Sequence, residues 1–194
     1  MGASRDQGAA IKGSLFGPVL DDFRALVDRG NLSPEDRDAR LEATDFAFLD
    51  EKIAVAVWYP IDTYARLLDT LRDVEGGERP DDYLRERGAA AAHRLIEGGV
   101  YSQMHATVDA WGERVGKIMV TLVPLMFNFG KWTCDTSGGG LQVDAEDVAP
   151  LPDATRIVIE GFIEVMAARA LHDEVTVCSE RPSPDRIHYE GTRG

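Results

Sequence analysis

The sequence predicts an α+β protein with about five to six helices packed on a four-stranded antiparallel sheet. Helical patterns fill the chain up to about residue 123, and two hairpin patterns separated by one more helix follow. With 194 residues, of which 44% are hydrophobic, the chain is long enough for one well-buried core. We therefore expect a disordered N-terminal tail over residues 1–10 and a single domain over residues 11–191.

Two helices are expected near the start of the chain. Residues 18–29 carry apolar side chains at helical spacing after Pro18, and Gly30 is a typical stop. Ser33 and Pro34 suit the N-cap and the first position of a second helix, which is short and highly charged.

The next segment joins an apolar run to a helix. The run IAVAV at 53–57 is typical of a strand or a buried extended segment. Asp62 is expected to cap a helix with one buried stripe, made of Tyr64, Leu67, Leu68 and Leu71. Trp58 and Tyr59 lie between run and helix, and we interpret them as anchors of the helix start, with a ligand clamp as the alternative.

Glycine pairs mark the ends of the following elements. Gly76-Gly77 ends the helix, and Pro80 opens another that runs to Gly98-Gly99. The longest helix is expected over about 103–123, with one apolar stripe: Val108, Trp111, Val115, Ile118 and Leu122.

After Pro124 the pattern changes to hairpins. Residues 129–134 and 141–143 flank a glycine-rich turn and predict two strands. A strong helix is expected over 154–171, where Gly161 lets a neighbour approach closely. Residues 174–179 and 186–190 then predict the second hairpin.

Charge limits the classes of partner. Lys and Arg number 21 against 34 Asp and Glu, a net charge of -13. Such a surface repels nucleic acid and anionic lipid, so we expect neither as a partner. The longest apolar run, at 118–127, is well short of the roughly 20 residues that cross a bilayer. No secretory signal pattern opens the chain. We expect a soluble, cytoplasmic protein without membrane insertion.

No residue pattern indicates a reaction. None of the four histidines has a second ligand at helical spacing, and neither an HExxH nor a GxSxG motif is present. Cys134 and Cys178 fall on predicted strands of one sheet and could be neighbours there, but no CxxC accompanies them. We interpret them as ordinary buried thiols, and we expect no catalytic residue and no metal site.

Aromatic and methionine side chains offer one candidate ligand site. Most are expected to fill the core. If the core is not filled, an apolar ligand would bind in a cleft between the longest helix and the sheet. The candidate lining is Trp111, Val115, Met119, Trp132 and Phe162.

Several segments together resemble a family of unknown function that is expanded in myxobacteria. They are WYPIDTYARLLDTL, YLRERGAAAAHRLIEGGVY, FGKWTC and IEGFIEVMAARALHDEVTVCSERPSPDRIHYEG, and the similarity covers most of residues 11–191. The closing helix with Gly161, the turn at His172-Asp173 and the two final strands are also distantly similar to a superfamily. Its members include the 4-vinyl reductase domain, the haem nitric-oxide-binding domain and the TRAPP transport subunits.

The superfamily resemblance implies helices against a twisted antiparallel sheet, often in a dimer, used for small-molecule sensing or as an interaction module. A haem-binding relative would place its ligating histidine near Met119, counted from the glycine that matches Gly88, and no histidine or YxSxR triplet stands here. Zinc-binding relatives use several cysteines near the last hairpin, where only Cys178 matches. We therefore expect neither haem nor zinc.

Two functions follow from this reading. The first is a non-enzymatic sensory or regulatory module that accepts an apolar small molecule between helices and sheet. The alternative is a protein-interaction adaptor with a filled core, which forms a homodimer or docks a signalling protein.

Overall fold

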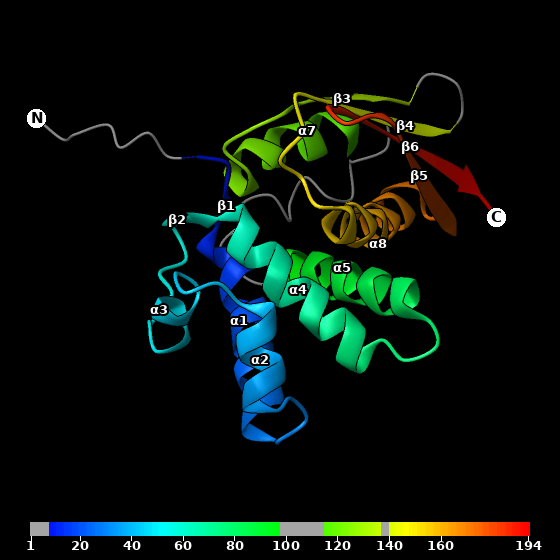
Figure 1. The fold of residues 1–194 in the computed structure, drawn as a ribbon. Coiled ribbons are helices and arrows are strands. Elements are labelled where there is room, and N and C mark those ends of the chain that lie inside the picture. Colours follow the sequence, from blue (N-terminus) through cyan, green and yellow to red (C-terminus); the bar gives the residue numbers. More distant parts are fainter. Residues whose placement is uncertain (1–7, 98–114, 137–139) are drawn as a thin grey trace, which may run out of the picture.

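A computed structural model describes residues 8–97, 115–136 and 140–194. It confirms the predicted α+β class: within these residues seven helices accompany one four-stranded and one two-stranded antiparallel sheet (Figure 1). The helices are α1 (Gly13–Asp28), α2 (Pro34–Arg40), α3 (Phe46–Leu49), α4 (Ile61–Glu75), α5 (Pro80–Glu97), α7 (Val115–Met126) and α8 (Asp153–Leu171). The strands are β1 (Ala10–Lys12), β2 (Trp58–Pro60), β3 (Lys131–Asp135), β4 (Leu141–Glu146), β5 (Val175–Ser183) and β6 (Arg186–Arg193).

The four-stranded sheet has the order β3-β4-β6-β5. Both predicted hairpins are present, and β6 pairs with β4 in addition to β5. Side chains alternate strictly along β4, where Leu141, Val143 and Ala145 are buried and the residues between them are exposed. One sheet face is therefore apolar and packs against α8, while the other is polar.

Helices α5 and α8 lie side by side between the four-stranded sheet and the group of α1, α2 and α4 (Figure 1). Glycines make this approach possible. A Cβ atom on Gly161 would lie 2.0 Å from the Arg85 carbonyl oxygen, and one on Gly88 would lie 1.9 Å from the Val158 carbonyl oxygen. The two helices thus touch backbone to backbone, as predicted at Gly161.

The run at 53–57 is not the strand or buried segment that its alternation suggests. Val55 and Val57 are 68% and 49% exposed. Their carbonyl oxygens accept hydrogen bonds from the backbone N–H groups of Ser14 and Gly13, at 3.1 and 2.9 Å. The run therefore caps the start of α1, because the first N–H groups of a helix lack partners within the helix. With this cap α1 begins five residues before Pro18.

Helix α4 confirms the predicted stripe, since Tyr64, Leu67, Leu68 and Leu71 are all buried. It begins at Ile61, with Pro60 at its N-cap and no side-chain cap, so the expected cap by Asp62 is wrong. Tyr59 is buried, stacks on Phe16 with ring centroids 4.7 Å apart, and accepts a hydrogen bond from the Ala54 N–H. Tyr59 thus anchors the start of this helix.

A buried carboxylate joins α3 to α4. Asp45 is 1% exposed and accepts hydrogen bonds from the Thr63 hydroxyl at 2.6 Å and from Arg66 Nε at 2.6 Å. Burial by itself raises the pKa of Asp45, but the hydrogen bonds from Arg66, Thr63 and the Glu42 N–H outweigh it and lower the pKa below its usual value.

The other boundaries agree with the sequence in most places. Ser33 caps α2, Gly30 and Gly77 adopt positive φ after α1 and α4, and α8 spans nearly the expected residues. Helix α7 continues through Pro124 to Met126. Much of the expected 103–123 helix lies outside the described residues.

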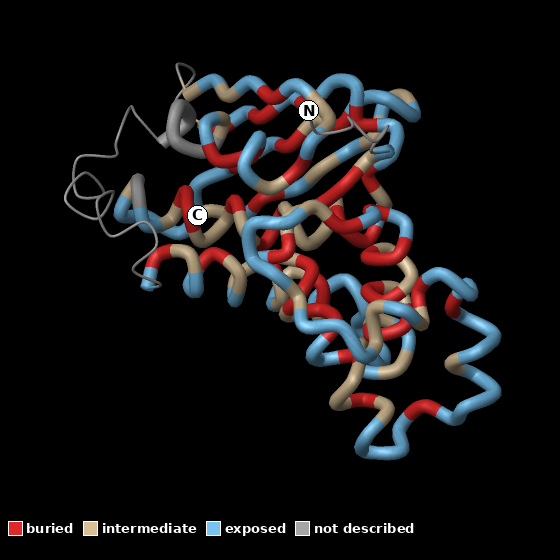
Figure 2. The backbone as a smooth tube through the Cα atoms, turned by 90° about the vertical axis from the view of Figure 1, so that its left-hand side faces the viewer, coloured by how far each residue is buried: buried red, intermediate tan, exposed pale blue. Residues whose placement is uncertain are grey.

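The core fills the space between the sheet, α8 and the remaining helices. Along the helices buried residues recur about once per turn, and along the strands they alternate with exposed ones (Figure 2). Among the described residues, no helix is both long enough and apolar enough to cross a membrane.

Candidate ligand-binding cavity

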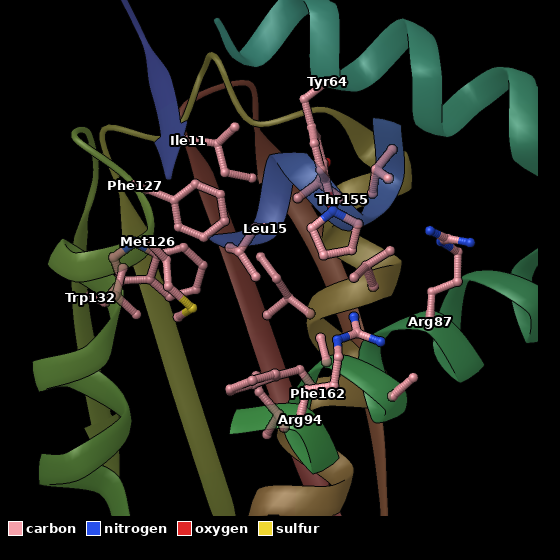
Figure 3. Close-up of a pocket in the computed structure, with 18 of the residues that line it drawn as sticks. Ile11, Leu15, Tyr64, Arg87, Arg94, Met126, Phe127, Trp132, Thr155 and Phe162 are labelled. Atoms are coloured by element: carbon pink, nitrogen blue, oxygen red, sulfur yellow. The ribbon is translucent and has the colours of Figure 1, made fainter. Parts of the chain in front are cut away.

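A cavity of about 170 Å³ lies between α1, α5, α7, α8 and the inner face of the sheet (Figure 3). Most of its wall is apolar. The described apolar lining residues are Ile11, Leu15, Pro18, Val19, Ala90, Ala91, Val120, Val123, Met126, Phe127, Trp132, Val143, Val158, Ile159, Phe162 and Ile163. An apolar wall with a few polar groups is typical of small-molecule sites in proteins.

Helix α8 builds one wall through its period. Thr155, Val158, Ile159, Phe162 and Ile163 are spaced by three or four residues, so they share one face of the helix. The glycine contacts with α5 fix how far this face stands from Ala90 and Ala91 on the opposite wall. The tight crossing of α5 and α8 therefore sets the width of the cavity.

Aromatic rings close the end of the cavity near the sheet. Phe127 and Trp132 line it, with ring centroids 6.5 Å apart, and Trp132 in turn stacks on Tyr189 at 6.0 Å. Ile11 of β1 forms an isolated bridge with Phe127 and also lines the cavity. The two sheets therefore meet at this end through large, rigid side chains.

Arg87 contributes a charged group that is already paired. Its guanidinium donates to Asp22 Oδ2 at 2.6 Å and to the Tyr83 hydroxyl at 3.0 Å. Asp22 also lines the cavity, so this pair bridges α1 and α5 at its edge. The pairing makes Arg87 part of the wall.

Four further side chains on the lining have polar atoms without partners among the described residues. One is Trp132, whose buried indole N–H has no hydrogen bond. The Thr155 hydroxyl is buried without a hydrogen bond, Arg94 has no hydrogen bond or ion pair, and the Tyr64 hydroxyl has no hydrogen bond. Burial raises the pKa of Tyr64 to about 12, with Arg87 and Arg94 acting in the opposite direction. The phenol therefore remains protonated at neutral pH and can donate a hydrogen bond.

The sequence-based candidate cleft overlaps this cavity in part. Trp132 and Phe162 both line it. Trp111 lies outside the described residues, and so do the side chains of Val115 and Met119. Trp58 and Tyr59 do not line the cavity.

Sequence reasoning missed the polar lining. Arg87 and Arg94 are seven residues apart on α5, with Ala90 and Ala91 between them, so the four share one helix face. The available signal was the placement of two arginines on either side of two alanines, on a helix expected to pack against the core. This pattern indicates a cavity only together with the positions of α1 and α8, which line the same space as this face of α5.

The other titratable candidates lie elsewhere. His188 contacts Asp144 at 2.8 Å on the polar face of the sheet, and His105 lies outside the described residues. Cys134 and Cys178 stand on β3 and β5, the opposite edges of the sheet, so they are not neighbours, and Cys178 is exposed. Burial raises the pKa of Cys134 to about 11. Among the described residues, no group of three or more His, Cys, Asp or Glu could hold a metal ion.

Comparison with known proteins gives a likeness in structure alone. No family model matches the chain. No curated protein matches it either. A mutant H-NOX protein from K. algicida, solved in its unliganded Fe(II) form, superposes with a TM-score of 0.61 at 12% identity, over 95% of this chain and 97% of that one. The fold is H-NOX-like.

Two further solved structures give the same result. An H-NOX protein from S. oneidensis in the Fe(II)NO state has a TM-score of 0.55 at 12% identity, over 95% of this chain and 99% of that one. A structure from a study of haem distortion in the H-NOX family has a TM-score of 0.58 at 12% identity, over 94% of this chain and 95% of that one. The predicted distant similarity to the haem nitric-oxide-binding domain is thus confirmed at the level of the fold.

These neighbours overturn one expectation. We did not expect haem, and this is wrong as stated, because the solved proteins that share the fold bind haem and make it a candidate cofactor. The expectation relied on one sequence position for the histidine and on a missing YxSxR triplet, and identities near 12% do not fix such positions.

The described lining fits two parts of this group. Its apolar wall has the chemistry that the faces of a macrocycle require, and Arg94 suits a propionate, but a cavity of about 170 Å³ encloses only part of a macrocycle. No described lining residue is a histidine or a cysteine, and the region that contains His105 is not described.

Proposed function

We propose that this protein is a non-enzymatic sensory module that binds an apolar small molecule in the cavity between α1, α5, α7, α8 and the sheet. The observation that carries the proposal is the cavity itself, with its apolar wall and with polar groups that have no partner in the described part of the chain. The H-NOX-like fold supports it, because the neighbours were solved with a ferrous centre or with bound nitric oxide. Haem is therefore the first cofactor to test, and a cavity weighs against the alternative of an adaptor with a filled core.

A charged network around the buried carboxylate of Glu160 carries the ligand signal from the cavity to the sheet. Glu160 of α8 is 3% exposed and pairs with Arg85 of α5 and with the Ser179 hydroxyl of β5. Arg85 also donates to Glu164 at 2.9 Å and to the Val177 carbonyl oxygen at 2.8 Å. A ligand that shifts α8 against α5 would change the charged contacts that α8 makes with β5, and so move the edge of the sheet.

The test compares the ligand affinity of the wild type with that of a variant whose cavity is partly filled by a larger side chain. Ala91→Leu adds a side chain to the wall, and Ala39→Leu makes the same change on exposed helix α2. Purified wild type would be mixed with haem and, separately, with a panel of apolar small molecules, and followed by absorbance and thermal shift.

We expect at least one compound to bind wild type and Ala39→Leu with one ligand per chain and to bind Ala91→Leu at least about tenfold more weakly. Binding that is equal in all three proteins would place the ligand elsewhere. A complete lack of binding, with no co-purified molecule, would contradict the proposed function and favour the adaptor.

A further inference from the structure

The two arginines of the cavity differ in their hydrogen bonds and ion pairs. Arg87 is satisfied by Asp22 and Tyr83. Arg94 lies about two turns further along the same face of α5 and has no hydrogen bond or ion pair within the described residues. This contrast is informative in a chain with 34 acidic against 21 basic residues, because carboxylates to pair with an arginine are plentiful.

Arg94 extends toward the cavity. In Figure 3 Arg94 reaches from α5 to the middle of the lining side chains, whereas Arg87 stands to one side. The charge of Arg94 opposes the rise in the pKa of Tyr64, and both residues line the same cavity. Arg94 is itself exposed, so its guanidinium can meet the charged end of a ligand while the apolar lining takes the uncharged body.

Two hydroxyls on the lining, of Thr155 and Tyr64, have no hydrogen bond among the described residues, and the Thr155 oxygen is fully buried. Thr155 is 2% exposed and Tyr64 is 4% exposed, and both line the same cavity. A buried hydroxyl without a partner is uncommon in folded proteins and often indicates a missing ligand or water. One cationic fork and two hydroxyl donors match the acceptor oxygens of a single carboxylate.

We infer that the ligand of this cavity is an apolar acid, whose carboxylate is bound by Arg94 with Tyr64 or Thr155 as a second donor. The inference rests on the proposed function. A carboxylate suits the site better than a phosphate, because the second arginine is already neutralised by Asp22. A cavity of about 170 Å³ is close to the roughly 150 Å³ that encloses benzene in an engineered protein, so the enclosed apolar body is about one ring in size.

The carboxylate could belong to a compact acid or to a haem propionate, and two pairs of probes distinguish these cases. 4-Ethylbenzoate represents a compact acid, and 4-ethylbenzamide is its uncharged isostere. Haemin represents a large acid with two propionates, and its dimethyl ester is the uncharged counterpart. Calorimetry follows the first pair and absorbance follows the second.

Three variants complete the experiment. Arg94→Gln removes the charge, Arg94→Lys keeps it without the fork, and Arg193→Gln removes the same charge from an exposed strand outside the cavity. Thermal unfolding checks that each variant folds.

Wild type and Arg193→Gln are expected to bind one of the two acids at least about tenfold more tightly than its uncharged counterpart. Arg94→Gln should bind acid and counterpart alike, and Arg94→Lys should fall between.

Equal affinity of wild type for an acid and its counterpart, or an Arg94→Gln variant that keeps the full preference, would overturn the inference and leave the cavity as a ligand site. If no probe binds and no compound of the wider panel binds, the proposed function fails, and the inference fails with it.

Discussion

The crossing of α5 and α8 gives the sharpest test of the fold. Gly161→Ala would place a methyl group 2.0 Å from the Arg85 carbonyl oxygen, whereas an ordinary carbon–oxygen contact is about 3.3 Å or more. The obstructing atom is backbone, so no side-chain rotation can relieve the clash. The helices would have to separate by about 1 Å.

The cost follows from two opposing effects. Overpacking a well-packed interior typically costs about 1–3 kcal/mol, and a clash with backbone belongs at the upper end. Alanine recovers about 1 kcal/mol because it favours helix more than glycine does. The free energy of unfolding should therefore fall by about 2 kcal/mol, which lowers the melting temperature by about 4–8 °C for a chain of this size.

Chemical and thermal denaturation followed by circular dichroism would measure this change. Gly17→Ala is the matched control, because it lies within α1 and its Cβ would meet only the side chain of Ile53, at 3.4 and 3.6 Å. The control should be neutral or up to about 1 kcal/mol more stable. A Gly161→Ala protein as stable as Gly17→Ala would show that α5 and α8 do not cross as described.

Three further predictions concern buried polar groups. Thr155→Val replaces an unsatisfied hydroxyl with a methyl group and should raise the free energy of unfolding by up to about 1 kcal/mol in urea denaturation; a clear loss would show that the hydroxyl has a partner. Glu160→Gln should cost about 2 kcal/mol because it removes the buried carboxylate from Arg85, which keeps Glu164, whereas Asp153→Asn, at an exposed carboxylate, should change stability by less than about 1 kcal/mol; equal effects would contradict the network. Asp45→Asn should cost about 3 kcal/mol at about pH 7. Since folding lowers the pKa of Asp45, its contribution is full above its unfolded pKa near 4 and is lost as the pH falls through the lower folded value, so the difference from wild type should shrink toward about pH 2; a difference independent of pH would refute this.

Local sequence patterns predicted the structure correctly where the feature depends on a single helix or hairpin. The stripe on α4, the cap at Ser33 and the close approach at Gly161 were each predictable, because each depends on periodicity or on a single residue's geometry. Both hairpins of the sheet were predictable for the same reason.

Tertiary partners decided the remaining cases. The run at 53–57 reads as a strand, but its carbonyl groups bind the first N–H groups of α1, which lie some forty residues earlier in the chain. The two cysteines were expected to be close because both are on strands, yet strand order separates them to opposite edges. Arg94 has no local signature, since what distinguishes it is the absence of a partner among the described residues of the fold.

In the candidate site too, local patterns predicted some residues and tertiary packing determined the others. Trp132 and Phe162 were predicted because large apolar residues at a strand and a helix face tend to point inward. The contributions of α1 could not be predicted, because nothing in the sequence indicates that α1 lines the same cavity as α5 and α8. The haem expectation was wrong for a related reason, as it transferred one residue position across a relationship visible only in the fold.

The central claim is that the interior holds an accessible apolar cavity. Xenon enters dry apolar cavities of this size, so xenon NMR tests the claim without knowledge of the natural ligand. We predict a saturable xenon shift with wild type and Ala39→Leu that is lost or strongly reduced with Ala91→Leu. Identical xenon shifts for the wild type and Ala91→Leu would contradict the account.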